Sequence, residues 1–174
     1  IAFCKDQGMA LLPCGGGTSQ CGQTVNHALV LDNTKYLNSI LELDVKNQRC
    51  IVEPGIVLDE LNRQLKPHGL WFPVDVSTSS RATIGGMTAN NSCGGRSIRY
   101  GIMRDNVHAI DAFLADGSHA HFGVYDPTKL PSSGRLSKVL PNLLGLGATY
   151  KDDILSSFPK VLRRVGGYNI DALI

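Results

Sequence analysis

The sequence lacks the features that mark several large classes of protein. It contains no apolar run near the ~20 residues that cross a bilayer, and no basic stretch followed by an apolar one opens it. Neither sign of charge dominates, because 17 Lys and Arg residues face 15 Asp and Glu residues for a net charge of +2. These absences argue against a transmembrane segment and against a nucleic-acid partner.

Cysteine is present in a pattern that does not suit structural bridges or metal sites. The five cysteines are an odd set, and no two are spaced as Cys-x-x-Cys. A disulfide framework needs pairs, and structural zinc or iron–sulfur sites need closely spaced ligands. A bridge between Cys14 and Cys21 is the one alternative that the spacing leaves open. The sequence therefore predicts a reducing setting, either cytoplasmic or peripheral to the inner membrane.

What the sequence does have is a sizeable apolar fraction and many glycines. Hydrophobic residues make up 43% and charged residues 18%, as in ordinary globular proteins, while 19 glycines are more than usual. A chain of 174 residues is long enough for one domain with its own core, or for two lobes that share one. The excess of glycine predicts loops that approach a ligand closely.

The first of these loops is "LPCGGGTSQCGQ", from Leu12 to Gln23. Consecutive glycines let backbone N–H groups converge on one point, which is how a peptide nest binds an anion. No lysine follows Gly17 as a mononucleotide P-loop requires, and Gly22 misses the third glycine of the dinucleotide fingerprint by two residues. Taken alone, the loop is either an anion site of another kind or a turn between two strands.

A second glycine-rich segment, "TIGGMTANN", begins at Thr83. The Thr83 hydroxyl is a suitable helix cap, and Gly85 and Gly86 would let a flat or phosphorylated group approach the backbone. The alternative is a helix packing contact that needs glycine for close approach. Two such segments, joined by strands and a helix, favour an extended ligand that is held from both sides.

Apolar periodicity predicts short helices and strands around these loops. The clearest helix places four apolar residues at helical spacing between Val57 and Leu65 and ends at Gly69. Another helix follows the Thr83 cap, and a third covers 135–147, where Pro141 should force a break or a new start. The strands are expected at residues 9–13, 27–32, 40–45, 49–55, 106–117 and 118–122, the last two as a hairpin around an Asp-Gly turn.

Strand 40–45 is expected to alternate strictly. Ile40, Glu42 and Asp44 should lie on one face, with Leu41, Leu43 and Val45 on the other.

Several motifs in a fixed order resemble one known family. They are "PCGGGTS", "VEPGIVLDELNRQLKPHGLWFPVDVSTSSRATIGGMTANNSCGGRSIRYG", "RDNV", "FLADG" and "RRVGGYNIDAL". Together they resemble the FAD-binding domain of the FAD-linked oxidases of the vanillyl-alcohol-oxidase type. The resemblance is strongest to D-lactate, glycolate and D-2-hydroxyglutarate dehydrogenases.

The resemblance implies an α+β fold of the vanillyl-alcohol-oxidase/PCMH type, with two lobes and the cofactor between them. Lobe one is expected at about 1–54 and lobe two at about 55–174. The chain opens inside a helix and stops without a terminal signal, so we expect a fragment truncated at both ends. The C-terminal substrate domain of the family, with its catalytic base, would then be absent.

The resemblance also implies which residues contact FAD. The first loop should wrap the pyrophosphate, and the later segments should lie along the cofactor, near its ribityl chain and flavin edge. The implied contacts are Gly15, Gly16, Gly17, Thr18, Ser19, Gly22, Gln23, Pro73, Asp75, Ser77, Thr78, Ser79, Thr83, Gly85, Gly86, Ala89, Asn90, Asn91, Tyr100, Gly101, Asp105 and Val107.

Some relatives attach the flavin to a histidine in the first loop. No histidine lies between Gly15 and Asn26, so we expect non-covalent FAD. We expect no metal site either, because His119 and His121 fit a hairpin surface better than a ligand pair. An iron–sulfur cluster, which large fused relatives carry, would lie on sequence outside this chain.

The activity implied by the resemblance is oxidation of a 2-hydroxy acid, of the D-lactate, glycolate or D-2-hydroxyglutarate class, with hydride transfer to flavin N5. No catalytic residue can be named, and this fragment alone is expected to be inactive. Two alternatives stay open. One is another FAD oxidoreductase of the same fold, such as a molybdenum-hydroxylase flavin subunit or an enolpyruvyl-sugar reductase. The other is a non-catalytic FAD-binding module.

Overall fold

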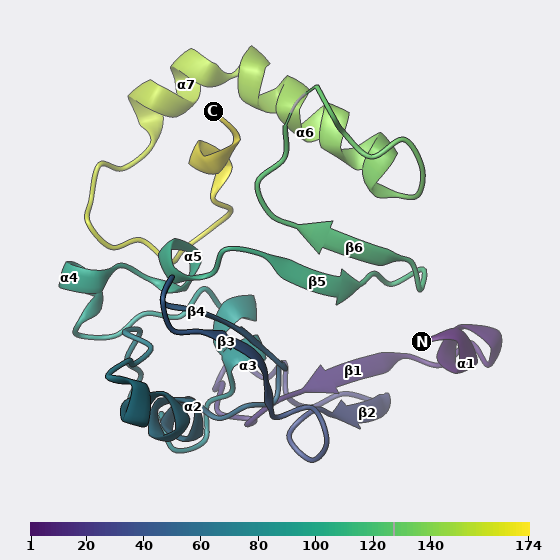
Figure 1. The fold of residues 1–174 in the computed structure, drawn as a ribbon. Coiled ribbons are helices and arrows are strands. Elements are labelled where there is room, and N and C mark those ends of the chain that lie inside the picture. Colours follow the sequence, from purple (N-terminus) through teal and green to yellow (C-terminus); the bar gives the residue numbers. More distant parts are fainter. Residues whose placement is uncertain (127) are drawn as a thin grey trace. The chain divides into compact units, whose positions relative to one another are not determined.

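The computed structural model describes residues 1–126 and 128–174 (Figure 1). The chain divides into two compact units, residues 1–107 and 108–174, and each is described by itself. Helices and two-stranded sheets are mixed along the chain, as expected for an α+β fold. None of the helices in the described ranges is long and apolar enough to cross a membrane. The boundary between lobes expected near residue 54 stays a prediction.

The first unit contains four strands and most of the short helices. One short helix precedes the four strands, and the remaining helices follow them, with a long irregular segment between η1 and α3. They are α1 (Ala2–Asp6), β1 (Leu11–Cys14), β2 (Leu29–Asp32), β3 (Ile40–Asp44), β4 (Arg49–Val52), α2 (Leu58–Leu65), η1 (Lys66–His68), α3 (Ile84–Ala89), α4 (Ser97–Tyr100) and α5 (Met103–Asn106).

β1 and β2 form a parallel pair in which Cys14 lies opposite Asp32 at the carboxyl ends (Figure 1). Parallel strands need a crossover, and here residues 15–28 provide it without a helix. The backbone N–H of Asn33 donates to the Cys14 carbonyl at 3.0 Å, which fixes the point where the glycine loop leaves the sheet. Ligands of α/β sheets commonly bind outside the carboxyl ends of strands, which is where this loop begins.

β3 and β4 form an antiparallel pair, but the expected alternation in β3 is wrong. The register shifts between Ile40 and Glu42, so Leu41 is an extra residue in the strand. Such a bulge moves the following side chains to the other face. As a result Ile40 and Leu43 both pack against the core, although they were expected on opposite faces, while Leu41 is 64% exposed.

The core of the first unit forms around the apolar face of α2. Leu58, Leu61 and Leu65 are buried, as their spacing predicted. Asp59 and Glu60 lie in the first turn, where they complement the helix dipole. Gly69 ends the η1 turn with a φ of 70°, a left-handed conformation that glycine adopts without strain. The buried partners of these leucines are Ile56, Val74, Ala82, Ile84, Met87 and Met103.

The second unit is a hairpin followed by helices. β5 (Ile110–Phe113) pairs with β6 (His119–Phe122) as predicted, and the Asp-Gly turn between them places Gly117 at a φ of 85°. α6 (Leu136–Thr149), α7 (Lys151–Ser157) and η2 (Ile170–Leu173) complete the unit. Gly147 of α6 lies directly against the Leu173 carbonyl, so the helix admits η2 only because this residue has no side chain.

The break expected at Pro141 is wrong, because α6 runs through it. A proline removes one backbone donor and contacts the carbonyl of the fourth preceding residue, but its φ is already helical. The apolar stretch on both sides continues the helix in spite of the one missing hydrogen bond.

Candidate cofactor site

The glycine loop presents a run of unused backbone donors. Among residues 1–126 and 128–174, no acceptor is recorded for the backbone N–H groups of the six residues Gly15 to Gln20. Gly17 has a φ of 62° and Gly22 a φ of 83°, so the chain reverses at these two points. Ser19 Oγ accepts a hydrogen bond from the Gln23 side chain, which closes the far part of the loop. Successive free N–H groups in a turn are the donor set of an anion nest.

The loop lies directly against the start of the second glycine-rich segment. A Cβ built on Gly15 would meet Thr83 Oγ1, and one built on Gly16 would meet the Arg81 carbonyl oxygen. Only glycine fits at these two positions. The structure therefore brings together the two segments that the sequence suggested as two sides of one site.

Thr83 connects this contact to helix α3. Its hydroxyl accepts from the Gly86 N–H at 3.4 Å, which confirms the predicted cap, and its side chain is 1% exposed. The amino end of a helix carries partial positive charge and favours anions. The Asn90 side-chain amide donates to the Gly86 carbonyl at 3.0 Å, and Ala89 is exposed at the other end of the helix.

Packing against Pro54 is enough to explain why residue 85 is a glycine. Its Cβ would lie 2.6 Å from Pro54 Cβ, and its N–H donates to the Pro54 carbonyl at 2.8 Å. This is the helix packing contact that the sequence left open for this residue.

An irregular stretch over 73–76 and turns over 77–81 lead into the loop contact. The Thr78 carbonyl accepts from the N–H groups of Arg81 and Ala82 at 2.8 and 2.7 Å. Ser79 accepts from the Asp59 N–H at 3.2 Å, which holds the turns against α2. Pro73 is half-buried and Ser77 is exposed.

Asp75 anchors the backbone of a neighbouring loop. Its carboxylate accepts from the Arg96 N–H at 2.9 Å, and a Cβ on Gly94 would run into the Asp75 carbonyl. In the structure Asp75 thus has a structural partner of its own.

The remaining predicted contacts lie around α4 and α5. Asp105 accepts from the Ile102 N–H at 2.9 Å and so caps α5, while Gly101, with a φ of 81°, leaves room for the Asp105 side chain. Asn91 accepts from the Arg104 N–H at 3.0 Å, which ties the end of α3 to α5. The Tyr100 ring is half-exposed, and Val107 packs against the core of the unit.

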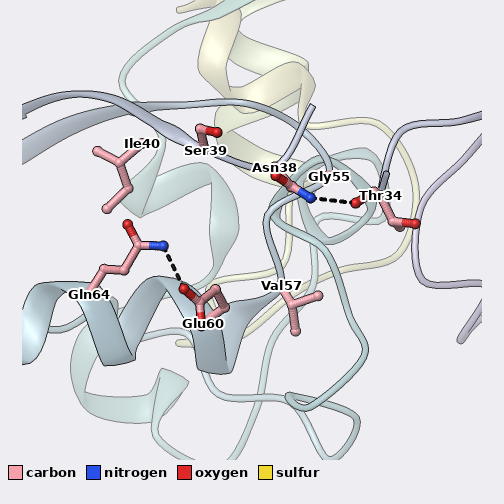
Figure 2. Close-up of a pocket in the computed structure, with 8 residues that line it drawn as sticks. All are labelled: Thr34, Asn38, Ser39, Ile40, Gly55, Val57, Glu60 and Gln64. Atoms are coloured by element: carbon pink, nitrogen blue, oxygen red, sulfur yellow. Dashed lines mark hydrogen bonds between the residues drawn. The ribbon is translucent and has the colours of Figure 1, made fainter. Parts of the chain in front are cut away.

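A pocket of about 420 Å³ lies elsewhere in the first unit (Figure 2). None of the predicted FAD contacts lines it. Figure 2 shows the Gln64 and Glu60 side chains of α2 on one side and Asn38 bonded to the Thr34 carbonyl on another. The sequence analysis missed this pocket, although the polar run "DNTKYLNS" between β2 and β3 is a signal for it. Its lining residues are Thr34, Asn38, Ser39, Ile40, Gly55, Val57, Glu60 and Gln64.

Glu60, which lines this pocket, is paired with the guanidinium of Arg63. The Arg63 guanidinium donates to its carboxylate at 2.6 and 2.7 Å, and the Gln64 amide donates at 2.7 Å. These hydrogen bonds, with that from Arg63 as the larger cause, lower the pKa of Glu60 from 4.5 to about 2. Because Arg63 balances the charge of Glu60, the carboxylate brings no unbalanced charge to the pocket.

His119 and His121 both lie near Asp111 on the hairpin, at 3.7 and 2.9 Å from its Oδ1. Among the described residues, no group of three or more His, Cys, Asp or Glu side chains has the arrangement of a metal site.

The comparisons with known proteins show the family of this chain. Residues 1–123 match the family described as FAD binding domain. The chain is similar to D-2-hydroxyglutarate dehydrogenase of Pseudomonas putida, at 36% identity over 94% of this chain and 17% of the relative. It is similar to a glycolate oxidase subunit of Bacillus subtilis, at 36% identity over 68% of this chain and 25% of the relative.

The fold is similar to that of a solved oxidase. The structure of 6-hydroxy-D-nicotine oxidase from Arthrobacter nicotinovorans matches 70% of this chain and 26% of its own, with a TM-score of 0.62 at 20% identity. The PCMH-type fold expected from the sequence is thereby confirmed. The chain spans only 17% of the length of the first of these relatives.

Proposed function

This chain belongs to the FAD binding domain family, and on that premise we propose that the Gly15–Gln20 turn holds the diphosphate of FAD. The single observation that carries the proposal is the run of six backbone N–H groups with no recorded acceptor in the described chain. A diphosphate supplies anionic oxygens for such donors without needing a cation from the protein. Gly15 and Gly16 support this placement, because any side chain there would fill the contact with Arg81 and Thr83.

The other contacts implied by the sequence remain part of this proposal. The amino end of α3 lies beside the loop and would add its dipole to the diphosphate site. Asp75, Asn91 and Asp105 have backbone partners within the protein, so we assign them to shaping the site. The absence of a histidine between Gly15 and Asn26 supports a non-covalent attachment.

For the whole protein we propose oxidation of a 2-hydroxy acid to the corresponding 2-oxo acid. The support is that D-2-hydroxyglutarate dehydrogenase and a glycolate oxidase subunit are similar to this chain. Bound FAD would accept the two electrons of that oxidation. The residues of this chain would bind and orient the cofactor. A cytoplasmic location is likewise proposed, and the five free cysteines are compatible with it.

The cofactor part is tested by equilibrium titration with FAD, FMN and riboflavin. A diphosphate site binds FAD at least about tenfold more tightly than riboflavin, since two or more hydrogen bonds to charged oxygens are lost without it. Equal affinities for FAD and riboflavin would mean that the loop holds no phosphate. Acid precipitation should release the flavin, and yellow colour in the pellet would contradict non-covalent attachment.

The activity part needs a separate measurement on the flavin-loaded full-length protein, because this chain alone is expected to be inactive. Addition of D-2-hydroxyglutarate, D-lactate or glycolate without oxygen should bleach the flavin absorbance. A flavin that stays oxidised with every hydroxy acid would favour another FAD oxidoreductase or a non-catalytic module. In that case the titration result would still stand.

A further inference from the structure

Two arginines of the first unit flank a pair of aromatic rings on the surface. The Arg96 guanidinium lies 5.3 Å from the centre of the Trp71 ring. The Trp71 and Tyr100 rings meet edge to face, with centres 5.2 Å apart, and Arg99 lies 5.4 Å from the centre of the Tyr100 ring. We call Trp71, Arg96, Arg99 and Tyr100 the arginine–aromatic patch.

The patch is open to solvent despite its two large rings. Trp71 is 42% exposed, Tyr100 39%, and both arginines are exposed. Ile98, which lies between the arginines in sequence, is 68% exposed. Trp, Tyr and Arg are the residues that contribute most to protein–protein binding, particularly where they cluster.

The backbone under the patch is fixed by hydrogen bonds. Asp75 accepts from the Arg96 N–H at 2.9 Å, and the Tyr100 carbonyl accepts from the Asn106 side chain at 3.0 Å. Ser97 is buried, and its hydroxyl accepts from the Gly94 N–H at 3.0 Å. A patch that is held in place before binding loses less entropy when a partner docks.

The segment that carries most of the patch is rich in arginine, and its nearest carboxylates in sequence, Asp75 and Asp105, lie at its two ends. Residues 76–104 contain no aspartate or glutamate, but they contain Arg81, Arg96, Arg99 and Arg104. Among the described residues, neither Arg96 nor Arg99 forms an ion pair with a carboxylate. Each guanidinium is stacked on a ring, which orients it and leaves its N–H groups for a partner.

From these observations we propose that the arginine–aromatic patch is a docking surface for an acidic protein segment, one that carries carboxylates beside apolar side chains. The carboxylates would pair with Arg96 and Arg99, and the apolar side chains would cover Trp71 and Ile98. A small anion would use the guanidinium groups but would leave the rings and Ile98 in water. None of the patch residues lines the pocket of Figure 2, and of the four only Tyr100 is among the implied FAD contacts.

Trp71 is the only tryptophan of the chain, so its fluorescence reports on the patch directly. The probe is a short synthetic peptide in which glutamates alternate with leucines. The matched control peptide has glutamine in place of each glutamate. We expect the acidic peptide to change the Trp71 emission saturably, and we expect the affinity to fall when salt rises from about 0.1 M to about 1 M.

Variants then assign the effect to residues. Arg96→Gln and Arg99→Gln should each weaken the acidic peptide about tenfold, as loss of a charged contact at the centre of an interface does. The matched control is Arg49→Gln in β4, an exposed arginine outside the patch, which should leave the affinity unchanged. Both glutamine variants keep the backbone N–H groups that anchor the loop, and circular dichroism checks that they remain folded.

Three results would overturn the docking surface. The first is equal binding of the acidic and glutamine peptides, or no saturable change with either. The second is an affinity for the acidic peptide that is unchanged in both Arg96→Gln and Arg99→Gln. The third is binding of glutarate or inorganic phosphate as tight as that of the acidic peptide, which would make the patch a small-anion site.

Discussion

The two units differ in how much apolar surface they bury. In the first unit α2 lies at the centre of a contiguous core, and the glycine loop rests against the segment that closes it. Among the described residues of the second unit, the buried apolar ones are only Ala120, Leu136 and Ile154. Its hairpin leaves Phe113 69% exposed.

The difference shows how the glycine loop, the proposed cofactor site, is held in place. Arg81 and Thr83, which contact the glycine loop, flank Ala82 and precede Ile84, both of which are core residues. The loop is thus positioned by the packed part of the chain. The second unit has no comparable core in the described residues, so its stability should respond less to loss of any one apolar side chain.

The sharpest test of this comparison is to replace one leucine in each unit by alanine and to compare the losses in unfolding free energy. Leu61→Ala should cost about 2 to 5 kcal/mol of unfolding free energy, because the side chain is 1% exposed and its loss leaves a cavity. Leu146→Ala in α6 should cost less than about 1 kcal/mol, since Leu146 is already 49% exposed. Urea denaturation of both variants measures the difference. Similar losses in the two would mean that the units do not differ in this way.

A second comparison uses glycines. Gly16→Val should weaken FAD at least tenfold and cost about 1 to 3 kcal/mol of stability, because the added atoms collide with the Arg81 carbonyl. Gly145→Val in α6 meets no neighbouring atom and should leave FAD affinity unchanged. Flavin titration and thermal unfolding measure both effects. A Gly16→Val protein that binds FAD normally would show that the glycine loop is not part of the FAD site.

Within the second unit, alanine substitutions at Gly147 and Gly145 distinguish the effect of packing on stability from the effect of helix propensity. Gly147→Ala should destabilise the unit by about 1 to 3 kcal/mol, because the new methyl group meets the Leu173 carbonyl. Gly145→Ala should stabilise it by about 1 kcal/mol, since alanine favours a helix and nothing lies in its way. Thermal unfolding distinguishes the two signs, and a stabilising Gly147→Ala would show that η2 does not pack there.

The smallest effect is in acid, where each unit has one carboxylate with a pKa of about 2. That of Glu60 is lowered mainly by Arg63, and that of Asp116 mainly by the Ser118 hydroxyl. A carboxyl group whose pKa is lowered by folding stabilises the folded protein at any pH above its ordinary pKa. This stabilisation is lost as the pH falls from the ordinary pKa toward the pKa in the folded protein. For Glu60 this window lies between 4.5 and about 2.

NMR titration of the two carboxyl carbons measures these midpoints. Arg63→Gln should raise the Glu60 midpoint and leave the Asp116 midpoint unchanged. Ser118→Ala should raise the Asp116 midpoint and leave the Glu60 midpoint unchanged. A Glu60 midpoint near 4.5 in the unmodified protein would contradict the hydrogen bonds to Arg63.

Much of the local structure could be predicted from the sequence, because it depends on near neighbours. The leucines of α2 and the ending at Gly69 follow from helical spacing and from glycine's left-handed φ. The Thr83 cap and the Asp-Gly hairpin turn are equally local signals.

The parts that could not be predicted depend on contacts between distant segments. The bulge at Leu41 is set by pairing with β4, and the continuity of α6 through Pro141 is set by the residues on both sides. That Gly16 meets Arg81 while Gly85 meets Pro54 cannot be read from a short glycine motif. The same limit applies to the pocket of Figure 2, whose walls come from three separate stretches.

Hydrogen exchange of the loop amides tests the central claim most directly. The amides of Gly15 to Gln20 have no recorded acceptor in the described chain, so they should exchange rapidly in the absence of flavin. FAD should slow their exchange, whereas riboflavin, which has no phosphate, should leave it unchanged. Loop amides that are already protected without FAD, or that exchange equally fast with saturating FAD, would contradict the diphosphate site.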